Sequence, residues 1–157
     1  MGNCCGTNST NDQAVHEYKN EQHTTEYYKL PKIIILPEDA ALIYLDASPI
    51  PTPASIRLKN SLKRKFPNLV SSDNDKRILN QIDMMKERKY YIIVVGHIRE
   101  ETLRSILKSS KVRAIYFCLE ETDLSSYFKS AKMKGFFQDQ MTLKKAIYYD
   151  IRLDDSY

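Results

Sequence analysis

The sequence predicts a single α/β domain, doubly wound around a mostly parallel five-stranded sheet. Two runs, YYIIVVG at 90–96 and VRAIYFCL at 112–119, are apolar throughout, which is typical of strands covered on both faces. Strand-like and helix-like segments alternate five times, with short connections between them. Because right-handed crossovers place helices on both faces of such a sheet, the expected strand order is 2-1-3-4-5.

The first strand and the first helix illustrate how each element is justified. Residues 40–46 (AALIYLD) form an apolar run that ends in an acid, which indicates a buried strand. Residues 54–66 carry Leu58, Leu62 and Phe66 at four-residue spacing, so these side chains share one helix face. Similar reasoning predicts, in order, a short strand at 68–73, a helix at 73–89, a strand at 90–96, a helix at 99–110, a strand at 112–119, a helix at 121–134, a strand at 135–139 and a helix at 140–153.

The chain divides into a polar leader, 1–30, and a folded domain, 31–157. The leader is rich in Asn, Thr, Gln and Glu and has no apolar period, so we expect a disordered tether. The domain opens with KIIIL at 32–36, a β-branched run stopped by Pro37. This run predicts either an extra edge strand or an extended arm packed on the domain.

Composition excludes several classes of function. The net charge of +4 is too mild to favour nucleic-acid binding. Three cysteines cannot form a disulfide framework of the secreted kind, and Cys118, inside an apolar run, is expected to be a buried thiol. The sequence has no apolar stretch approaching the roughly 20 residues of a membrane span and no apolar signal-peptide core. A cytoplasmic chain is therefore expected, unless a lipid holds it to a membrane.

The N-terminus, MGNCCGT, carries the chemistry of such an anchor. Removal of Met1 would expose Gly2, the residue that N-myristoylation requires, although Gly6 stands where the M-G-x-x-x-[ST] pattern has Ser or Thr. A single myristoyl chain binds membranes weakly, so a second signal is needed. Cys4 and Cys5 lie where a palmitoyltransferase could acylate them. The tip resembles the dually acylated N-termini of Src-type kinases and G-protein α subunits, which implies peripheral attachment to the cytoplasmic face of a membrane.

Two other interpretations of this tip remain open. The cysteines could be incidental residues of a disordered leader. They could also bind a metal, although the chain offers no further Cys or His at zinc-site spacing.

The first helix carries a cluster of basic residues that could supply a further membrane contact. Each basic residue near an anionic leaflet adds about 1 kcal/mol of binding free energy. The alternative is an ordinary solvated face. The membrane-facing candidates are Arg57, Lys59, Lys63, Arg64 and Lys65.

The carboxyl ends of the first and third strands define a candidate ligand crevice. Ligands of open parallel sheets bind at this switch point. The expected lining is Asp46, Ser48, Gly96 and His97. Asp46 and His97 could act as an acid/base pair; the alternative is that Asp46 caps a loop and His97 is a polar strand-end residue. Gly-rich phosphate loops, G-x-S-x-G elbows and zinc spacings are missing from the sequence, so we expect no cofactor and no catalytic activity.

Two known folds resemble this pattern. In receiver domains a phosphoacceptor Asp ends the third strand; here Gly96 and His97 stand at that place, so the resemblance implies a pseudo-receiver. Toll/interleukin-receptor-type domains share the strand–helix order, but this chain has no matching catalytic glutamate motif.

Residues 40–150 also resemble the α/β domain that begins many large rotifer proteins, often ahead of ADP-ribosyltransferase or tetratricopeptide-type segments. The family pattern of W-L-D, V-S-G, S-I-Y-x-x-C and K-x-K-G-V corresponds here to four motifs. The resemblance implies the fold and carries over no transferase activity. The motifs are IYLD (43–46), IIVVG (92–96), RAIYFC (113–118) and KMKGFF (132–137).

These observations predict a membrane-tethered, non-catalytic signalling or adaptor domain that binds the membrane through acyl chains and binds an unidentified protein, but no nucleic acid. The alternative is a small enzyme or nucleotide- or ligand-binding domain that uses the strand-end crevice. A deep polar pocket beyond Asp46 and Gly96 would favour catalysis, whereas a crevice filled by side chains would favour binding.

Overall fold

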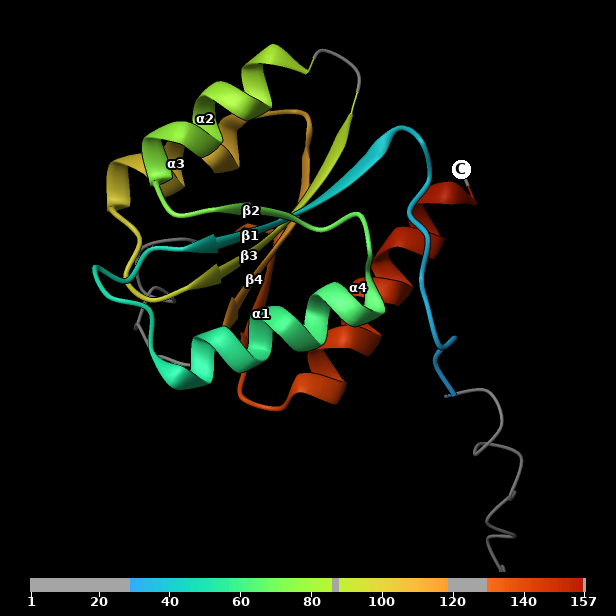
Figure 1. Ribbon diagram of the computed structural model, residues 1–157. Helices are drawn as coiled ribbons and strands as arrows, with labels where there is room; N and C mark the ends of the chain where they lie inside the picture. Colours follow the sequence, from blue (N-terminus) through green and yellow to red (C-terminus); the bar gives the residue numbers. More distant parts are fainter. Residues whose placement is uncertain (1–28, 86–87, 119–129, 157) are drawn as a thin grey trace, which may run out of the picture.

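Helices and strands alternate through most of the described chain. The computed structural model describes residues 29–85, 88–118 and 130–156 (Figure 1). The expected tether, 1–30, therefore lies almost wholly outside the described residues. The elements are β1 (Ala40–Asp46), α1 (Pro53–Lys65), β2 (Val70–Ser72), α2 (Asp75–Met84), β3 (Lys89–Val95), α3 (Glu100–Lys108), β4 (Val112–Cys118), β5 (Met133–Phe137) and α4 (Gln140–Asp155).

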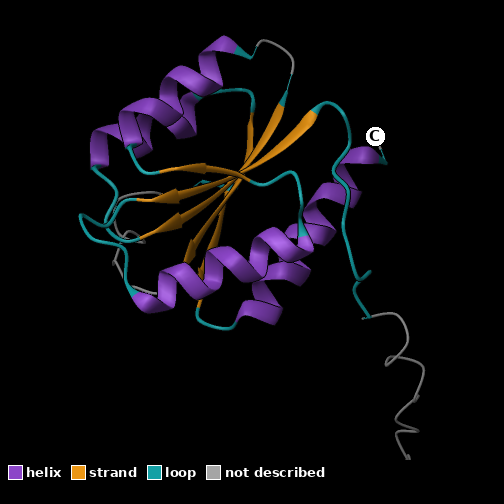
Figure 2. Ribbon diagram, viewed as in Figure 1, coloured by secondary structure: helices purple, strands orange, loops and turns teal. Residues whose placement is uncertain are grey.

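The five strands form one sheet in the order β2-β1-β3-β4-β5, and every neighbouring pair is parallel (Figure 2). The predicted fold class and strand order are thus confirmed. β1 and β3 pair along their whole length, from Ala40 beside Lys89 to Asp46 beside Val95. The carboxyl ends of the two central strands consequently lie side by side, which is where the candidate crevice was expected.

Helices α1 and α4 cover one face of the sheet, and α2 and α3 cover the other (Figure 1). Successive strand residues alternate between the two faces: Leu42 and Tyr44 pack with α1 and α4, whereas Ile43 and Leu45 pack with α2 and α3. The central strands are therefore buried on both sides, as their unbroken apolar runs predicted. Within the described ranges, no helix is long and apolar enough to cross a membrane.

Two buried tyrosines fasten α4 to the sheet. The Tyr91 hydroxyl donates to Asp154 Oδ2 at 2.5 Å, and the Tyr116 hydroxyl donates to Asp150 Oδ2 at 2.6 Å. Burial, followed by the hydrogen bond to Asp150, raises the pKa of Tyr116 far above its ordinary value. Both hydroxyls therefore remain protonated donors, and they fix where α4 crosses its face of the sheet.

The structure corrects two predicted boundaries. The helix expected at 121–134 is wrong at its end, because Met133 and Lys134 belong to β5; its first part, up to residue 129, lies outside the described residues. Met133 pairs with Ile115 of β4, and this long-range ladder overrides the local helical pattern. The helix expected at 73–89 is also too long, since α2 ends at Met84 and Lys89 begins β3.

The KIIIL segment is the extended arm, not an extra strand of the sheet. Ile34 is 5% exposed, whereas Ile33 is 51% and Ile35 66% exposed, so alternate side chains face the protein and the solvent. The arm is bound to the end of α1: Ile34 N donates to the carbonyl of Lys65 at 2.7 Å, and Lys65 Nζ donates to the carbonyl of Pro31 at 2.5 Å. Figure 1 shows the arm beside the C-terminal end of α1.

Candidate functional site

The crevice between the ends of β1 and β3 is filled by the protein itself. The loop after β1 crosses to β3, where Ala47 N donates to the carbonyl of Val95 at 2.8 Å. Gly96 has a φ of 81° and lies against this loop; a Cβ there would come within 2.9 Å of Ser48 N and closer still to Ser48 Oγ. A side chain at position 96 is therefore excluded by both backbone conformation and contact. The candidate residues Ser48 and Gly96 form a packed seam rather than a pocket.

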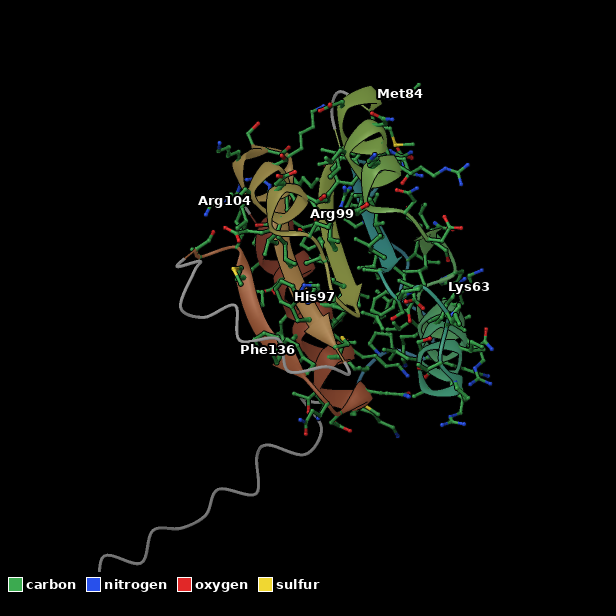
Figure 3. All side chains as sticks on the ribbon, turned by 90° about the vertical axis from the view of Figure 1, so that its left-hand side faces the viewer. Lys63, Met84, His97, Arg99, Arg104 and Phe136 are labelled. Atoms are coloured by element: carbon green, nitrogen blue, oxygen red, sulfur yellow. The ribbon has the colours of Figure 1, made fainter. Side chains whose placement is uncertain are left out.

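Asp46 caps the loop that follows β1, which was the alternative to its acting as an acid or base. Its Oδ1 accepts a hydrogen bond from Ser48 N at 3.0 Å, the loop-capping geometry of an Asx turn. Asp46 lines one cavity, and the exposed His97 lines two others. Figure 3 looks onto the carboxyl edge of the sheet, with His97 beside the strand ends and Lys63 apart from it. The expected acid/base pair is thus split between different cavities.

The cavity next to His97 is bounded by an ion pair. It has a volume of about 310 Å³ and is lined also by Asp75 and Arg99. Arg99 Nε and Nη2 donate to the two carboxylate oxygens of Asp75 at 2.5 and 2.9 Å, and Thr102 Oγ1 adds a bond at 2.9 Å. The hydrogen bonds from Arg99 hold the pKa of Asp75 below its ordinary value. Arg99 and Asp75 satisfy each other, so this cavity offers His97 no free carboxylate from Asp75.

A larger polar cavity lies at the β2 edge of the sheet, and we call it the β2 cavity. It has a volume of about 490 Å³, within the range of small-molecule sites. Its walls come from α1, from the ends of β1 and β2, and from the start of α2. The charged groups around it are Asp46, Lys59, Lys63, Asp73 and Arg77.

The floor of the β2 cavity is formed by three buried side chains whose hydroxyls are already hydrogen-bonded. Tyr44, Ser55 and Ser72 are 1%, 1% and 4% exposed. The Tyr44 hydroxyl donates to the carbonyl of Ser55 at 3.0 Å, Ser55 Oγ donates to the carbonyl of Thr52 at 2.9 Å, and Ser72 Oγ donates to the carbonyl of Asn74 at 3.1 Å. Burial raises the pKa of Tyr44 well above its ordinary value, so the phenol stays neutral.

The five basic residues of α1 fall into three groups with different surroundings. Arg57 and Arg64 are exposed and lie seven residues apart, two turns along the same outer face. Lys59 and Lys63 are four residues apart and line the β2 cavity. Lys65 holds the arm. The single membrane-facing cluster predicted from sequence is therefore divided by the helix geometry.

Positive charge gathers where α1 meets α4. Lys144 Nζ donates to Ser61 Oγ at 2.6 Å. Burial lowers the pKa of Lys144, and the nearby Lys65 and Arg64 lower it further. Lys144 thus adds a third positive charge beside Arg64 and Lys65 at the end of α1, where the arm is attached.

The candidate lipidation residues, Gly2, Cys4 and Cys5, lie outside the described residues. Cys118 lies in β4 and is 2% exposed, and burial raises the pKa of its thiol to about 12. A neutral, buried thiol is chemically inert, as the sequence predicted. Across the described ranges, no group of three or more His, Cys, Asp and Glu side chains is arranged to hold a metal ion.

Sequence reasoning missed the contributions of Asp73 and Arg77. The switch-point rule directed attention to the ends of β1 and β3, whereas the open cavity lies one strand further, at the sheet edge. The shortness of the second strand could have pointed to this cavity. A three-residue edge strand covers little of the space between the side chains of α1 and those at the start of α2.

Three comparisons with known proteins were made. No protein-family model matches the sequence, and no curated protein matches it. One solved structure, described as "putative lipoprotein from Peptoclostridium difficile 630 (fragment)", is similar with a TM-score of 0.49 and 18% sequence identity, over 73% of this chain and 99% of that chain. A similarity at this level carries no argument about this protein.

Proposed function

We propose that this protein is a membrane-tethered, non-catalytic binding domain of the pseudo-receiver type, held at the cytoplasmic face of a membrane, where it presents its folded part to a signalling protein. The observation that carries this proposal is the attachment of the arm to α1. Because Lys65 binds the arm at Pro31, the described chain starts at the end of α1 that carries the exposed Arg64, and this start is the exit toward Gly2, Cys4 and Cys5. Acyl chains on the tip and basic charge on the domain would then reach the same bilayer.

The surface around this exit has the chemistry of a peripheral membrane contact. Ile33 and Ile35 project from the arm as exposed apolar side chains, and Arg57 and Arg64 lie on the outer face of α1. Neither arginine makes an ion pair with any other described residue. Apolar side chains next to basic ones favour binding to an anionic leaflet, and each basic residue contributes about 1 kcal/mol.

The filled β1–β3 crevice supports the non-catalytic form of the proposal. Asp46 is occupied by a loop bond, and Gly96 and His97 stand where a receiver domain carries its phosphoacceptor. A receiver-like domain that lacks the phosphoacceptor Asp has lost the group that accepts phosphate, but its outer surfaces can still bind other proteins.

Vesicle binding by an unacylated full-length chain tests the membrane surface. The chain carries Gly2→Ala, Cys4→Ser and Cys5→Ser, so only the protein surface contributes. Binding to phosphatidylcholine vesicles containing phosphatidylserine is expected at low salt and should weaken at high salt, since screening acts over about 10 Å at 0.1 M. Adding Arg57→Glu and Arg64→Glu should weaken binding by about thirtyfold, from about 1 kcal/mol for each arginine.

A matched control separates this surface from net charge. Lys76→Glu with Lys108→Glu makes the same charge change at exposed positions of α2 and α3, which cover the other face of the sheet. This pair should reduce vesicle binding far less. Equal losses in the two double variants would contradict the proposed surface, and no binding by the parent chain at low salt would leave the acyl chains as its only membrane contact.

A further inference from the structure

The β2 cavity holds charges of both signs that do not pair with one another. Lys59 and Lys63 line it from α1, and Arg77 lines it from α2. Asp46 and Asp73 line it from the ends of β1 and β2. Among the described residues, none of these five groups makes an ion pair within 4.0 Å. Three cations and two carboxylates thus line a shared space of about 490 Å³ without an ion pair among the described residues, and only Asp46 is partly occupied, by Ser48 N.

The charged donors of this cavity come from two helices. The floor hydroxyls of Tyr44, Ser55 and Ser72 already donate to backbone carbonyls. The charged donors left are the two ammonium groups of α1, one helical turn apart, and the Arg77 guanidinium of α2. Lysines bind phosphate as point charges, and a guanidinium binds it through two parallel hydrogen bonds. Three cationic side chains that line one cavity from two helices match the charge and hydrogen-bonding needs of a phosphate group.

The carboxylates add a second requirement. Ionised Asp accepts hydrogen bonds and donates none, and it repels a bare anion. Asp73 on the cavity wall therefore disfavours a ligand that is only phosphate and favours one that also carries hydroxyl donors. Asp46 contributes less, because Oδ1 is occupied by Ser48 N.

We propose that the β2 cavity binds a phosphomonoester of a polyol, with its phosphate between Lys59, Lys63 and Arg77 and a hydroxyl of its ring or chain on Asp73. The ligand is either a free polyol phosphate or the phosphorylated polyol headgroup of a lipid. This proposal goes beyond the membrane surface formed by Arg57 and Arg64, neither of which lines the cavity.

Calorimetric titration of the unacylated full-length chain tests the site in solution, with inositol bisphosphate as the probe. Binding is expected, and Lys59→Gln with Lys63→Gln should weaken it at least tenfold, because charge-assisted hydrogen bonds are lost. Arg57→Gln with Arg64→Gln removes the same charge from the same helix outside the cavity and should leave binding within about twofold. No binding by the parent chain, or equal losses in both double variants, would overturn the site.

Two further variants protect the test against misfolding and isolate the polyol contact. If Lys59→Gln with Lys63→Gln proves thermally unstable, Arg77→Gln takes its place as the test. It changes an exposed side chain on a different helix and should also weaken binding. Asp73→Asn should weaken binding of inositol bisphosphate yet leave binding of inorganic phosphate equal or tighter, since it replaces one acceptor oxygen by an NH₂ donor and removes the negative charge. Changes of the same sign for both probes would refute the assigned orientation.

Vesicles distinguish the two sources of the ligand. Phosphatidylcholine vesicles with phosphatidylinositol monophosphate present the headgroup on a bilayer. If Lys59→Gln with Lys63→Gln weakens binding to these vesicles as well as to the soluble probe, a lipid headgroup reaches the cavity. If it weakens only the soluble binding, the ligand is a free polyol phosphate. Phosphatidylserine vesicles measure the Arg57 and Arg64 surface separately. The membrane surface and the β2 cavity ligand are therefore tested independently, and failure of one does not decide the other.

Discussion

Arg99, at the N-cap of α3, holds Asp75, in the first turn of α2, through two hydrogen bonds of 2.5 and 2.9 Å. The pair joins the starts of the two helices that cover one face of the sheet. It also orders the wall next to His97, where both residues line the cavity. The relationship has a measurable consequence for stability against pH.

Acid should weaken the protein partly through Asp75. The pKa of its carboxyl is lowered in the folded state, chiefly by Arg99, so its contribution to stability is present above the ordinary value of about 3.9 and is lost as pH falls below it. Asp75→Asn should cost about 1 kcal/mol at pH 7, a modest figure because Arg99 is half exposed. Urea unfolding from pH 7 to pH 3 should show a smaller decline for Asp75→Asn than for the parent chain. Glu100→Gln, at an exposed ion pair with Arg104, is the control and should change the free energy of unfolding little. Parallel pH profiles for the parent and Asp75→Asn chains would contradict a stabilising role of Asp75.

Gly96→Ala should destabilise the protein by about 2 kcal/mol or more. The added Cβ meets Ser48 and forces a positive φ on alanine. Gly135→Ala is the matched control, because Gly135 also has a positive φ, 119°, but a Cβ there meets nothing within 4 Å. Thermal unfolding of the two variants separates contact from backbone strain. If Gly135→Ala costs as much as Gly96→Ala, the Ser48 contact contributes nothing to the closed seam.

Lys65→Met should loosen the arm without unfolding the domain. The substitution keeps the apolar stem of the side chain but removes the ammonium that donates to Pro31. Amide hydrogen exchange at Ile34, whose N–H donates to the carbonyl of residue 65, should accelerate severalfold while exchange in β3 stays unchanged. Arg64→Met, at an exposed neighbour, should leave exchange at Ile34 as it was. Unaltered exchange in Lys65→Met would mean that the backbone bond of Ile34 and the packing of Ile34 and Leu36 hold the arm without the Lys65 ammonium.

Gly2→Ala should move the protein from membranes to the soluble fraction of cells, because the methyl group of alanine hinders the α-amine that would accept the myristoyl group. Cys4→Ser with Cys5→Ser should leave only weak, reversible attachment, since one acyl chain binds marginally. Fractionation with metabolic labelling by the two fatty acids measures both effects. Wild-type fractionation of Gly2→Ala would show that lipidation at this residue does not hold the protein.

What the sequence by itself determined was the layered architecture. The apolar runs at 90–96 and 112–119 indicated strands buried on both faces, and the spacing of Leu58 and Leu62 indicated a helix packed on them. Such patterns are local, because the spacing of apolar residues along a short segment shows whether one or both of its faces are buried. Short crossovers between parallel strands then left few strand orders, and the expected one was observed.

The tertiary structure alone decided which side chains meet. Met133 joined a strand because Ile115 lay beside it, against the helical pattern of its own segment. The expected crevice is closed because the loop at Ala47 and Ser48, distant in the chain, packs on Gly96. Arg77 shares a cavity with Lys63 only because α1 and α2 flank the short edge strand β2. These contacts depend on strand register and loop path, which involve residues distant in the chain and leave no period in the sequence.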